Sequence, residues 1–240
     1  MKVFADTNIG LARAENQDRV KTAILCDSAA FAVICDGMGG ENAGSEASER
    51  AINVVYDRVT KVFRSDYDEK AIRNLLISAV TTANAVVYDA AWCDADKQGM
   101  GTTCVMALKK DGKLHVVSVG DSRAYLVTDR VVQITKDHTV VMRMYEKGEI
   151  TKEEIKNHPK KNYITKAVGV ADTVSPDYFE VDIDENAVVV LCSDGLSNYC
   201  DEDVLLGIVQ SSEREKIAEK LINTALNGGG GDNVTVAVIA

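Results

Sequence analysis

The sequence predicts an α+β fold in which antiparallel β-sheets are covered on their outer faces by helices. Short runs of β-branched residues are joined by connections of turn length, as in the DGKLHVVSVGDSRAYLV region. The long segments with helical periodicity lie apart from these runs along the chain. Strands that follow one another through tight turns pair antiparallel, which leaves the helices to pack outside the sheets.

The strands are expected where β-branched residues are concentrated. These runs span residues 31–35, 104–108, 114–119, 124–127, 187–192 and 234–239. One helix is expected over 66–91, where apolar residues recur every three or four positions and mark one buried face. A second is expected over 43–63. A third, over 213–226, should end at Asn227 and the glycines that follow it.

The segment 139–161 fits neither pattern. It carries two methionines, Gly148, and a capping-box pattern at Thr151 and Glu154, and it ends in the basic pair Lys160 and Lys161. We predict a helical insertion beside a functional edge.

Composition limits the domain organisation and the partners. The 240 residues contain no linker, repeat or low-complexity tract, so we expect one domain over 1–240. No apolar run approaches the roughly 20 residues of a membrane helix, and the N-terminus does not resemble a signal peptide. We therefore expect a cytoplasmic monomer without a membrane partner. The net charge of −10, with no basic cluster, argues against a nucleic-acid partner.

The cysteines and histidines do not form a metal-binding pattern. None of the six cysteines belongs to a C-x-x-C pair, and Cys35, Cys104 and Cys192 lie within apolar runs. The three histidines are far apart in sequence. We interpret the cysteines as small buried hydrophobes, so any metal should be bound through oxygen.

Four aspartates stand at the ends of predicted strands. Asp36, Asp121 and Asp194 each follow a strand directly, whereas Asp232 precedes one. The end of one antiparallel strand lies beside the start of its neighbour, so Asp194 and Asp232 meet if their strands pair. Clustered carboxylates raise one another's pKa and require a compensating cation, which for hard oxygen ligands is Mg²⁺ or Mn²⁺.

Glycines beside these aspartates fit the same interpretation, although each motif also has a simpler explanation. Gly37, Gly39 and Gly40 would let the backbone approach an ion or a phosphate. A lone Asp-Gly pair is usually a turn, and a lone Arg13 or Arg123 is usually a surface or salt-bridge residue. The interpretation depends on the combination.

Taken together, these segments resemble the metal-dependent serine/threonine protein phosphatases of the type 2C (PPM) family, especially their compact bacterial members. The resemblance runs through ADTNIGLARAENQD, VICDGMGGENAGSEAS, GTTCVMAL, VSVGDSRAYLV, ITKDHT, NHPKKNYITKAVG, VLCSDGLSNY and GGGGDNVTVAVI, in the family's order. It implies a four-layer α/β/β/α sandwich with two central antiparallel sheets. It also implies phosphoprotein substrates, with a cognate serine/threonine kinase as the opposing enzyme.

The resemblance also assigns residues to roles. Asp36 would bridge two metal ions, Asp194 and Asp232 would bind the first, and the Gly37 carbonyl would bind the second. Asp18 would act on the second ion through water. Asp121, with Asp194, would hold a third and weaker ion. Arg13 would bind the substrate phosphate through its fixed fork of donors. Segment 139–161 would be the flap beside the site.

Two positions depart from the family pattern. Gln17 stands where some members have a metal-binding glutamate, so its contact with the second ion would be weaker or mediated by water. Met38 stands where animal-type members have a histidine that is thought to protonate the leaving group. The resemblance therefore does not identify the general acid in this sequence. Asn233 completes the Asp-Asn motif as a supporting residue.

The mechanism expected from this resemblance is in-line attack on phosphorus by a metal-bridged hydroxide, without a phosphoenzyme. Two alternatives remain open at this stage: an inactive phosphoprotein-binding scaffold, and a hydrolase of small phosphoesters that uses the same centre.

Overall fold

Two antiparallel sheets lie face to face at the centre of the computed structural model, which describes residues 1–39, 43–184 and 186–240. Gly40, one of the predicted site glycines, falls outside the described residues. The first sheet has the order β1-β11-β10-β7-β8. Its strands are β1 (Val3–Asn8), β11 (Val234–Ile239), β10 (Val188–Cys192), β7 (Arg123–Val127) and β8 (Val131–Gln133).

The second sheet has the order β2-β3-β5-β6-β9, with the short β4 paired to β3. Its strands are β2 (Asp18–Cys26), β3 (Ala29–Met38), β4 (Gly101–Thr102), β5 (Cys104–Lys110), β6 (Lys113–Val119) and β9 (Asp177–Asp182). Every pairing within the described residues is antiparallel, as the turn-length connections predict.

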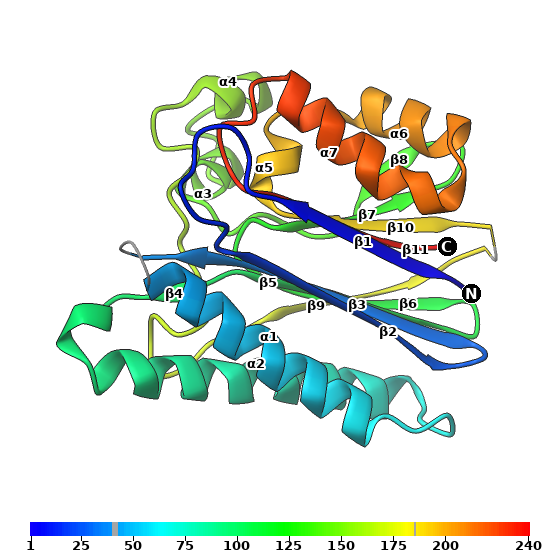
Figure 1. Cartoon of the computed structure of the whole chain (residues 1–240), viewed down its shortest axis with the longest axis horizontal. Coiled ribbons are helices and arrows are strands. Elements are labelled where there is room, and N and C mark those ends of the chain that lie inside the picture. Colours follow the sequence, from blue (N-terminus) through cyan, green and yellow to red (C-terminus); the bar gives the residue numbers. More distant parts are fainter. Residues whose placement is uncertain (40–42, 185) are drawn as a thin grey trace.

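Helices cover the outer face of each sheet (Figure 1). The second sheet is covered by α1 (Ala43–Val62) and α2 (Glu69–Trp92), and the first by α6 (Glu202–Ser211) and α7 (Ile217–Asn227). The short α5 (Asp194–Ser197) follows β10, and two 3-10 turns, η1 (Ala95–Lys97) and η2 (Arg214–Lys216), complete the set. The predicted four-layer α/β/β/α sandwich is therefore confirmed.

Three apolar layers hold these elements together. One lies between α1, α2 and the second sheet, one between α6, α7 and the first sheet, and one between the two sheets. Strands β10 and β11 are buried along their whole length, because one face meets helices and the other meets the opposite sheet. Such strands appear in the sequence as continuous apolar runs, which is why they were predicted correctly.

Helix α2 is the one described helix whose length and composition would also suit a membrane span. Its apolar face, which includes Ile72, Leu76 and Val80, is buried in the layer between the helices and the second sheet. In this structure α2 therefore packs as a core helix.

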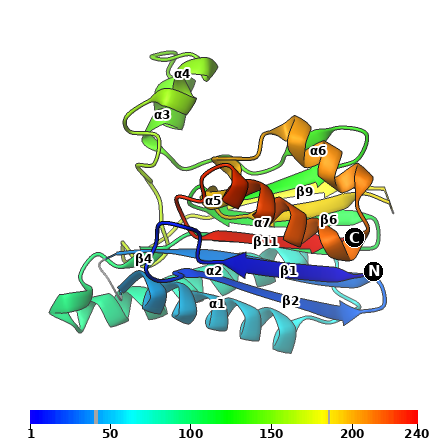
Figure 2. The same cartoon turned by 45° about the horizontal axis from the view of Figure 1, so that its top comes forward.

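The predicted insertion is helical and projects from the layers (Figure 2). It contains α3 (Val140–Glu146) and α4 (Lys152–Asn157). The capping box expected at Thr151 and Glu154 is formed: the Thr151 hydroxyl accepts from the Glu154 N–H, and the Glu154 carboxylate accepts from the Thr151 N–H at 2.7 Å. We call residues 139–161 the flap.

Several elements had no sequence prediction. Strands β1, β8 and β9 are edge strands of their sheets. Their residues are half-buried or exposed, so the apolar pattern that would predict them is weak. Strand β2 was missed because polar residues such as Lys21 and Thr22 interrupt it. The cysteine interpretation holds for Cys35, Cys104 and Cys192, but it is wrong for Cys93, which is exposed at the C-terminal end of α2.

Candidate metal centre

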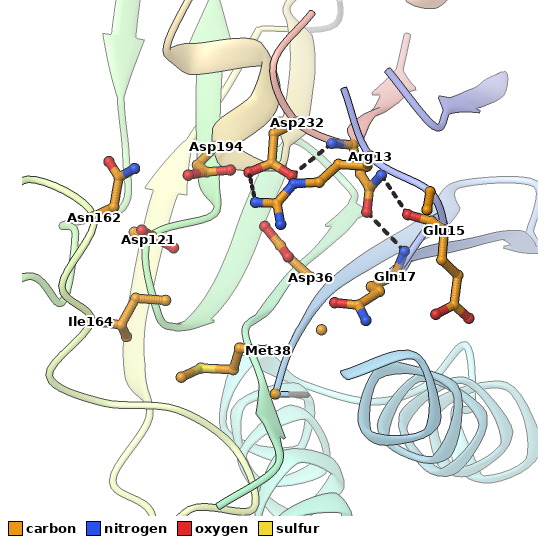
Figure 3. A pocket seen from close by; sticks show the side chains of 14 residues that line it. Arg13, Glu15, Gln17, Asp36, Met38, Asp121, Asn162, Ile164, Asp194 and Asp232 are labelled. Atoms are coloured by element: carbon orange, nitrogen blue, oxygen red, sulfur yellow. Dashed lines mark hydrogen bonds and ion pairs between the residues drawn. The ribbon is translucent and has the colours of Figure 1, made fainter. Parts of the chain in front are cut away.

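With the exception of Asp18, which lies behind Asp36 as its partner in the β2–β3 register, the predicted site residues that the structure describes line one pocket of about 510 Å³ at an edge of the sandwich (Figure 3). The residues that line this pocket come from the loop after β1, the end of β3, the turns after β6 and β10, the turn before β11, and the chain that returns from the flap, whose Asn162 and Ile164 were not predicted. The lining residues are Arg13, Ala14, Glu15, Gln17, Asp36, Gly37, Met38, Gly39, Asp121, Asn162, Ile164, Asp194, Asp232 and Asn233.

Asp36 and Asp18 are register partners in the β2–β3 pair. Asp18 is almost fully buried, and its Oδ2 accepts a 2.7 Å hydrogen bond from the Ser193 hydroxyl, while its Oδ1 has no partner. Burial raises the pKa of Asp18 to about 6. Burial, with the charge of Asp18 next in importance, raises the pKa of Asp36 well above its usual range.

Asp194 and Asp232 meet because β10 and β11 pair, which is the condition that the sequence analysis set for their meeting. The register joins Cys192 to Val236, which puts the end of β10 beside the start of β11. Burial, followed by the charges of Asp121 and Asp232, raises the pKa of Asp194 to about 7. The turns approach very closely: a Cβ on Gly195 would lie 1.9 Å from the Asn233 carbonyl oxygen. Only glycine fits there.

Asp121 lines the pocket on the same side as Asp194 (Figure 3). It is buried, and its Oδ1 has no hydrogen-bond partner. Burial, with the charge of Asp137 next, raises the pKa of Asp121 to about 6. The residue before it, Gly120, has φ +102°, a conformation that other residues rarely adopt.

Thr103 joins the Asp36 and Asp121 segments, a role that sequence reasoning missed. Its hydroxyl accepts from the Asp36 N–H at 3.0 Å and shares a 2.7 Å hydrogen bond with the Ser122 hydroxyl. Its own N–H donates to the Asp36 carbonyl at 2.8 Å. Thr103 therefore fixes both strand ends relative to each other. Its position in the GTTC block, directly before the apolar run of β5, was the available signal.

Arg13 lies at the rim of the pocket with its guanidinium among the carboxylates (Figure 3). Its Nη2 donates to Asp232 Oδ2 at 2.7 Å, and about half of its side chain is exposed. The charges of Asp194 and Asp36 also act on it. The arginine thus neutralises part of the negative charge and keeps donors at the pocket mouth.

The loop that carries Arg13 is fastened by Asn233. The Asn233 amide donates to the carbonyls of Ile9 and Glu15 at 2.8 and 2.9 Å, and its Oδ1 accepts from the Gln17 N–H at 2.8 Å. Sequence reasoning gave Asn233 only a supporting role, whereas the structure shows that it closes the loop. Asn233 makes these contacts because it is buried beneath the loop, and the spacing of residues in the sequence does not indicate burial of this kind.

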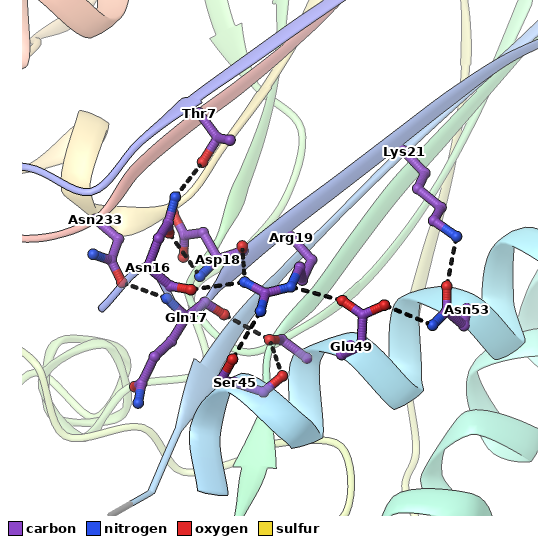
Figure 4. Close-up of polar contacts among 11 residues, drawn as sticks. Thr7, Asn16, Gln17, Asp18, Arg19, Lys21, Ser45, Glu49, Asn53 and Asn233 are labelled. Carbon is purple, nitrogen blue, oxygen red and sulfur yellow. Dashed lines mark hydrogen bonds and ion pairs between the residues drawn. The ribbon is translucent and has the colours of Figure 1, made fainter. Parts of the chain in front are cut away.

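The start of β2 is tied to α1 by a second polar network (Figure 4). Arg19 donates to the Glu49 carboxylate and to the Ser45 hydroxyl at 2.8 and 2.7 Å. The Ser48 hydroxyl donates to the Gln17 carbonyl at 2.6 Å. Through these contacts α1 determines where the Gln17–Asp18 backbone meets the pocket.

The predicted Gly37 stands where β3 approaches α1 most closely. A Cβ on Gly37 would lie 2.0 Å from the Gly44 carbonyl oxygen, and Gly39 has φ +150°. Met38 lines the pocket below Asp36, and no acid–base group is available from its side chain (Figure 3). The glycines therefore serve close backbone packing as well as access to the pocket.

The donor set fits hard divalent cations. Four carboxylates converge, three with pKa values raised mainly by burial and then by neighbouring charges, and two buried oxygens lack partners. Across the described residues, no three His, Cys, Asp or Glu side chains already form a complete metal-binding group.

Comparison with known proteins identifies the family. The family model described as protein phosphatase 2C matches residues 12–226. The chain belongs to the protein phosphatase 2C family. As a member, it is a serine/threonine protein phosphatase.

Relatives and solved structures agree with this family assignment. The chain is 34% identical over 235 residues to the serine/threonine phosphatase stp of Listeria monocytogenes, which covers 97% of this chain and 93% of that protein. It superposes on the serine/threonine phosphatase Stp1 of Staphylococcus aureus with a TM-score of 0.93 at 32% identity, covering 100% and 94% of the two chains. It superposes on the PstP catalytic domain in complex with two manganese ions with a TM-score of 0.85 at 33% identity, covering 99% and 96%.

The raised pKa values of this phosphatase predict how its metal-free stability depends on pH. A carboxyl whose pKa is higher in the folded state binds more protons there, so stability falls as pH rises from about 4 to the folded value. For Asp18, Asp121 and Asp194 that interval ends between about 6 and about 7. In EDTA, the melting temperature should therefore fall as pH rises from about 5 to about 7.

The matched control for this measurement is Asp194→Asn. His115 and His138, whose pKa values burial lowers, act in the opposite direction, so wild type and variant must be compared. The variant should lose less stability than the wild type over the same pH interval. Parallel pH profiles for the two proteins would show that Asp194 does not titrate as the structure indicates.

Proposed function

We propose that this phosphatase hydrolyses phosphoserine and phosphothreonine in proteins with two Mn²⁺ or Mg²⁺ ions held by the pocket carboxylates. Asp36, Asp194 and Asp232, with the Gly37 carbonyl, would hold the ions, and Asp18 would act through water. Asp121 with Asp194 would hold a third, weaker ion. The observation that carries the proposal is that carboxylates from four separate segments converge in one pocket, and that burial raises the pKa of three of them, Asp36, Asp121 and Asp194.

The ions, when bound, supply the Lewis acidity that makes water a nucleophile near neutral pH. The protein itself contributes binding and orientation. Arg13 offers a planar fork of N–H donors at the pocket mouth, which matches the non-bridging oxygens of a phosphate. These positioning and electrostatic contributions dominate catalysis of phosphoryl transfer.

The surroundings of the pocket support direct attack without a phosphoenzyme. Cys35 and Cys192 are fully buried. The neighbouring Cys104 thiol and burial raise the pKa of Cys35, and burial raises the pKa of Cys192 to about 12. A thiol in this state is a poor nucleophile at neutral pH.

The test of the proposed function is Mn²⁺-dependent release of phosphate from a phosphothreonine peptide, compared with a phosphotyrosine peptide of the same sequence. We expect turnover of the first, little turnover of the second, and loss of activity in EDTA. Activity that survives EDTA, or equal rates on both peptides, would overturn the proposal. A panel of free phosphate esters assayed in parallel would show whether small molecules are better substrates.

Arg13→Ala should lower kcat/KM for phosphopeptides by about 100-fold, because one charge-assisted pair of hydrogen bonds to phosphate contributes about 2–3 kcal/mol. Inhibition by inorganic phosphate should weaken in parallel. Arg13→Lys should recover only part of the loss, since an ammonium lacks the planar fork. Arg50→Ala, which removes an exposed Arg–Glu46 pair on α1, is the control and should have no effect. An Arg13→Ala enzyme with unchanged phosphate inhibition would exclude the assigned role.

A second prediction concerns the proton for the leaving oxygen, which Met38 cannot supply. Asp121 lies in the pocket wall with an unpartnered Oδ1, so we infer that protonation comes from its side of the pocket. Aryl phosphates have better leaving groups and need less protonation. Asp121→Asn should therefore reduce kcat on phosphopeptides at least about tenfold more than on p-nitrophenyl phosphate. Equal losses on both substrates would contradict the inference.

A further inference from the structure

His138 connects the Asp121 turn to the flap. The chain enters and leaves the flap through two short segments, residues 138–140 and 163–165, which we call the flap neck. They pair through a Thr139–Ile164 bridge, a 2.9 Å hydrogen bond from the Val140 N–H to the Tyr163 carbonyl, and one of 2.7 Å from the Thr165 N–H to the His138 carbonyl. His138 is therefore a structural part of the neck.

The same histidine holds Gly120, the residue before Asp121, by two hydrogen bonds. The backbone N–H of His138 donates to the Gly120 carbonyl at 2.9 Å. The backbone N–H of Gly120 donates to Nδ1 of the His138 ring at 3.0 Å. Because Nδ1 accepts, the ring proton of neutral His138 is on Nε2. This nitrogen lies 3.1 Å from Asp177 Oδ2, and Asp177 Oδ1 accepts from Lys166.

Gly120 depends on such neighbours for its conformation. It has no side chain of its own, and its φ of +102° lies where glycine has much freedom. A Cβ on Gly120 would lie 2.6 Å from Thr103 Cγ2, so Thr103 packs closely against Gly120 while His138 holds its N–H and its carbonyl. Both neighbours are buried, His138 with only 9% of its surface exposed. The direction of the next residue, Asp121, is thereby set.

We propose that His138 is a positioning residue that fixes Asp121 in the pocket wall and links it to the flap neck. The proposal rests on the proposed function, because it gives Asp121 a role in the reaction. The neck also leads to Asn162 and Ile164, which line the same pocket. A displacement of the flap is thus coupled to Asp121 through the backbone N–H and the imidazole of His138.

Two substitutions separate the contacts of the ring. Asparagine places an amide oxygen where His138 has Nδ1, so His138→Asn retains an acceptor for the Gly120 N–H. Glutamine places an amide where the ring has Nε2, so His138→Gln retains the contact with Asp177 and loses the acceptor. Both variants bury one neutral amide, so a general loss of packing affects both.

Two readouts are measured on the full chain. The first is kcat and KM on a phosphothreonine peptide with Mn²⁺. The second is the rate of tryptic cleavage in the flap, which offers Arg143 and Lys147, measured without metal in EDTA. For His138→Gln we expect kcat to fall and cleavage to accelerate, each about tenfold, with KM nearly unchanged, as expected for one buried hydrogen bond. His138→Asn should stay within about threefold of wild type on both.

Equal effects of the two variants, or no effect of either, would overturn the proposal. If the wild type shows no phosphatase activity, the proposed function fails, whereas the cleavage rates still decide whether His138 holds the neck. Amide hydrogen exchange in the wild type provides a measurement that does not depend on any variant. The Gly120 N–H should be protected as strongly as the core strand β5, and exchange at the rate of an open loop would contradict the assigned hydrogen bond.

Discussion

Replacing Asp36 with asparagine should stabilise the metal-free protein, remove most of its stabilisation by Mn²⁺ and lower its activity by at least about 10³-fold. Burial and the neighbouring acidic charges make an ionised Asp36 unfavourable in the folded state, which is why its pKa is raised. A neutral amide of nearly the same shape relieves this repulsion. The melting temperature in EDTA at neutral pH should therefore rise.

The same substitution should remove the response to metal. Free metal at roughly 100 times its dissociation constant adds about 2.7 kcal/mol to the free energy of unfolding of the wild type. For a chain of this size, this raises the melting temperature by about 5–10 °C. Asp36→Asn should lose most of this rise. Its kcat should fall at least about 10³-fold, since the bound ions would lower the activation free energy by several kcal/mol.

The control is Asp57→Asn, the same chemical change at an exposed position on α1, where Asp57 pairs with Lys61. It should leave both the metal response and the activity unchanged. An undiminished Mn²⁺ response in Asp36→Asn would mean that the ions bind elsewhere. Thermal melts with and without Mn²⁺, together with phosphate release, provide all the measurements.

Gly195→Ala should destabilise the protein by about 3 kcal/mol and weaken metal binding, although it adds only a methyl group. The new Cβ would lie 1.9 Å from the Asn233 carbonyl oxygen, a backbone atom that cannot rotate away. The turn after β10 and the turn before β11 must then separate. Since these turns carry Asp194 and Asp232, the Mn²⁺ concentration required for half-maximal activity should increase.

Gly207→Ala is the matched control for this change. Gly207 lies within α6, and a Cβ there meets no atom within 4 Å. Alanine favours the helix over glycine, so this variant should be more stable than the wild type by about 0.5–1 kcal/mol. Opposite signs for the two substitutions, measured by chemical denaturation, are the expected result. A Gly195→Ala protein as stable as the wild type would show that the turns can separate without cost.

The sequence located the pocket residues whose chemistry shows in a local motif, and it missed the residues whose part depends on contacts in space. An aspartate beside glycine or asparagine recurs at several strand ends in this sequence. A single such motif is usually a turn, but its recurrence indicates a shared site, and this is how Asp36, Asp194 and Asp232 could be found. Thr103 and His138 could not be found in this way. Their neighbours in space, Asp36 and Gly120, are remote in sequence, and no periodicity relates the two positions.

The sequence by itself determined the strands with two buried faces, the long amphipathic helices and the identity of the carboxylates, because each depends on residue type and short-range spacing. Only the tertiary structure decided the order of strands in each sheet and the hydrogen bonds by which Asn233 holds the loop that carries Arg13. It also decided how far burial raises the pKa of each carboxyl. The physical reason is that desolvation and Coulomb interactions depend on distances between groups that lie far apart along the chain.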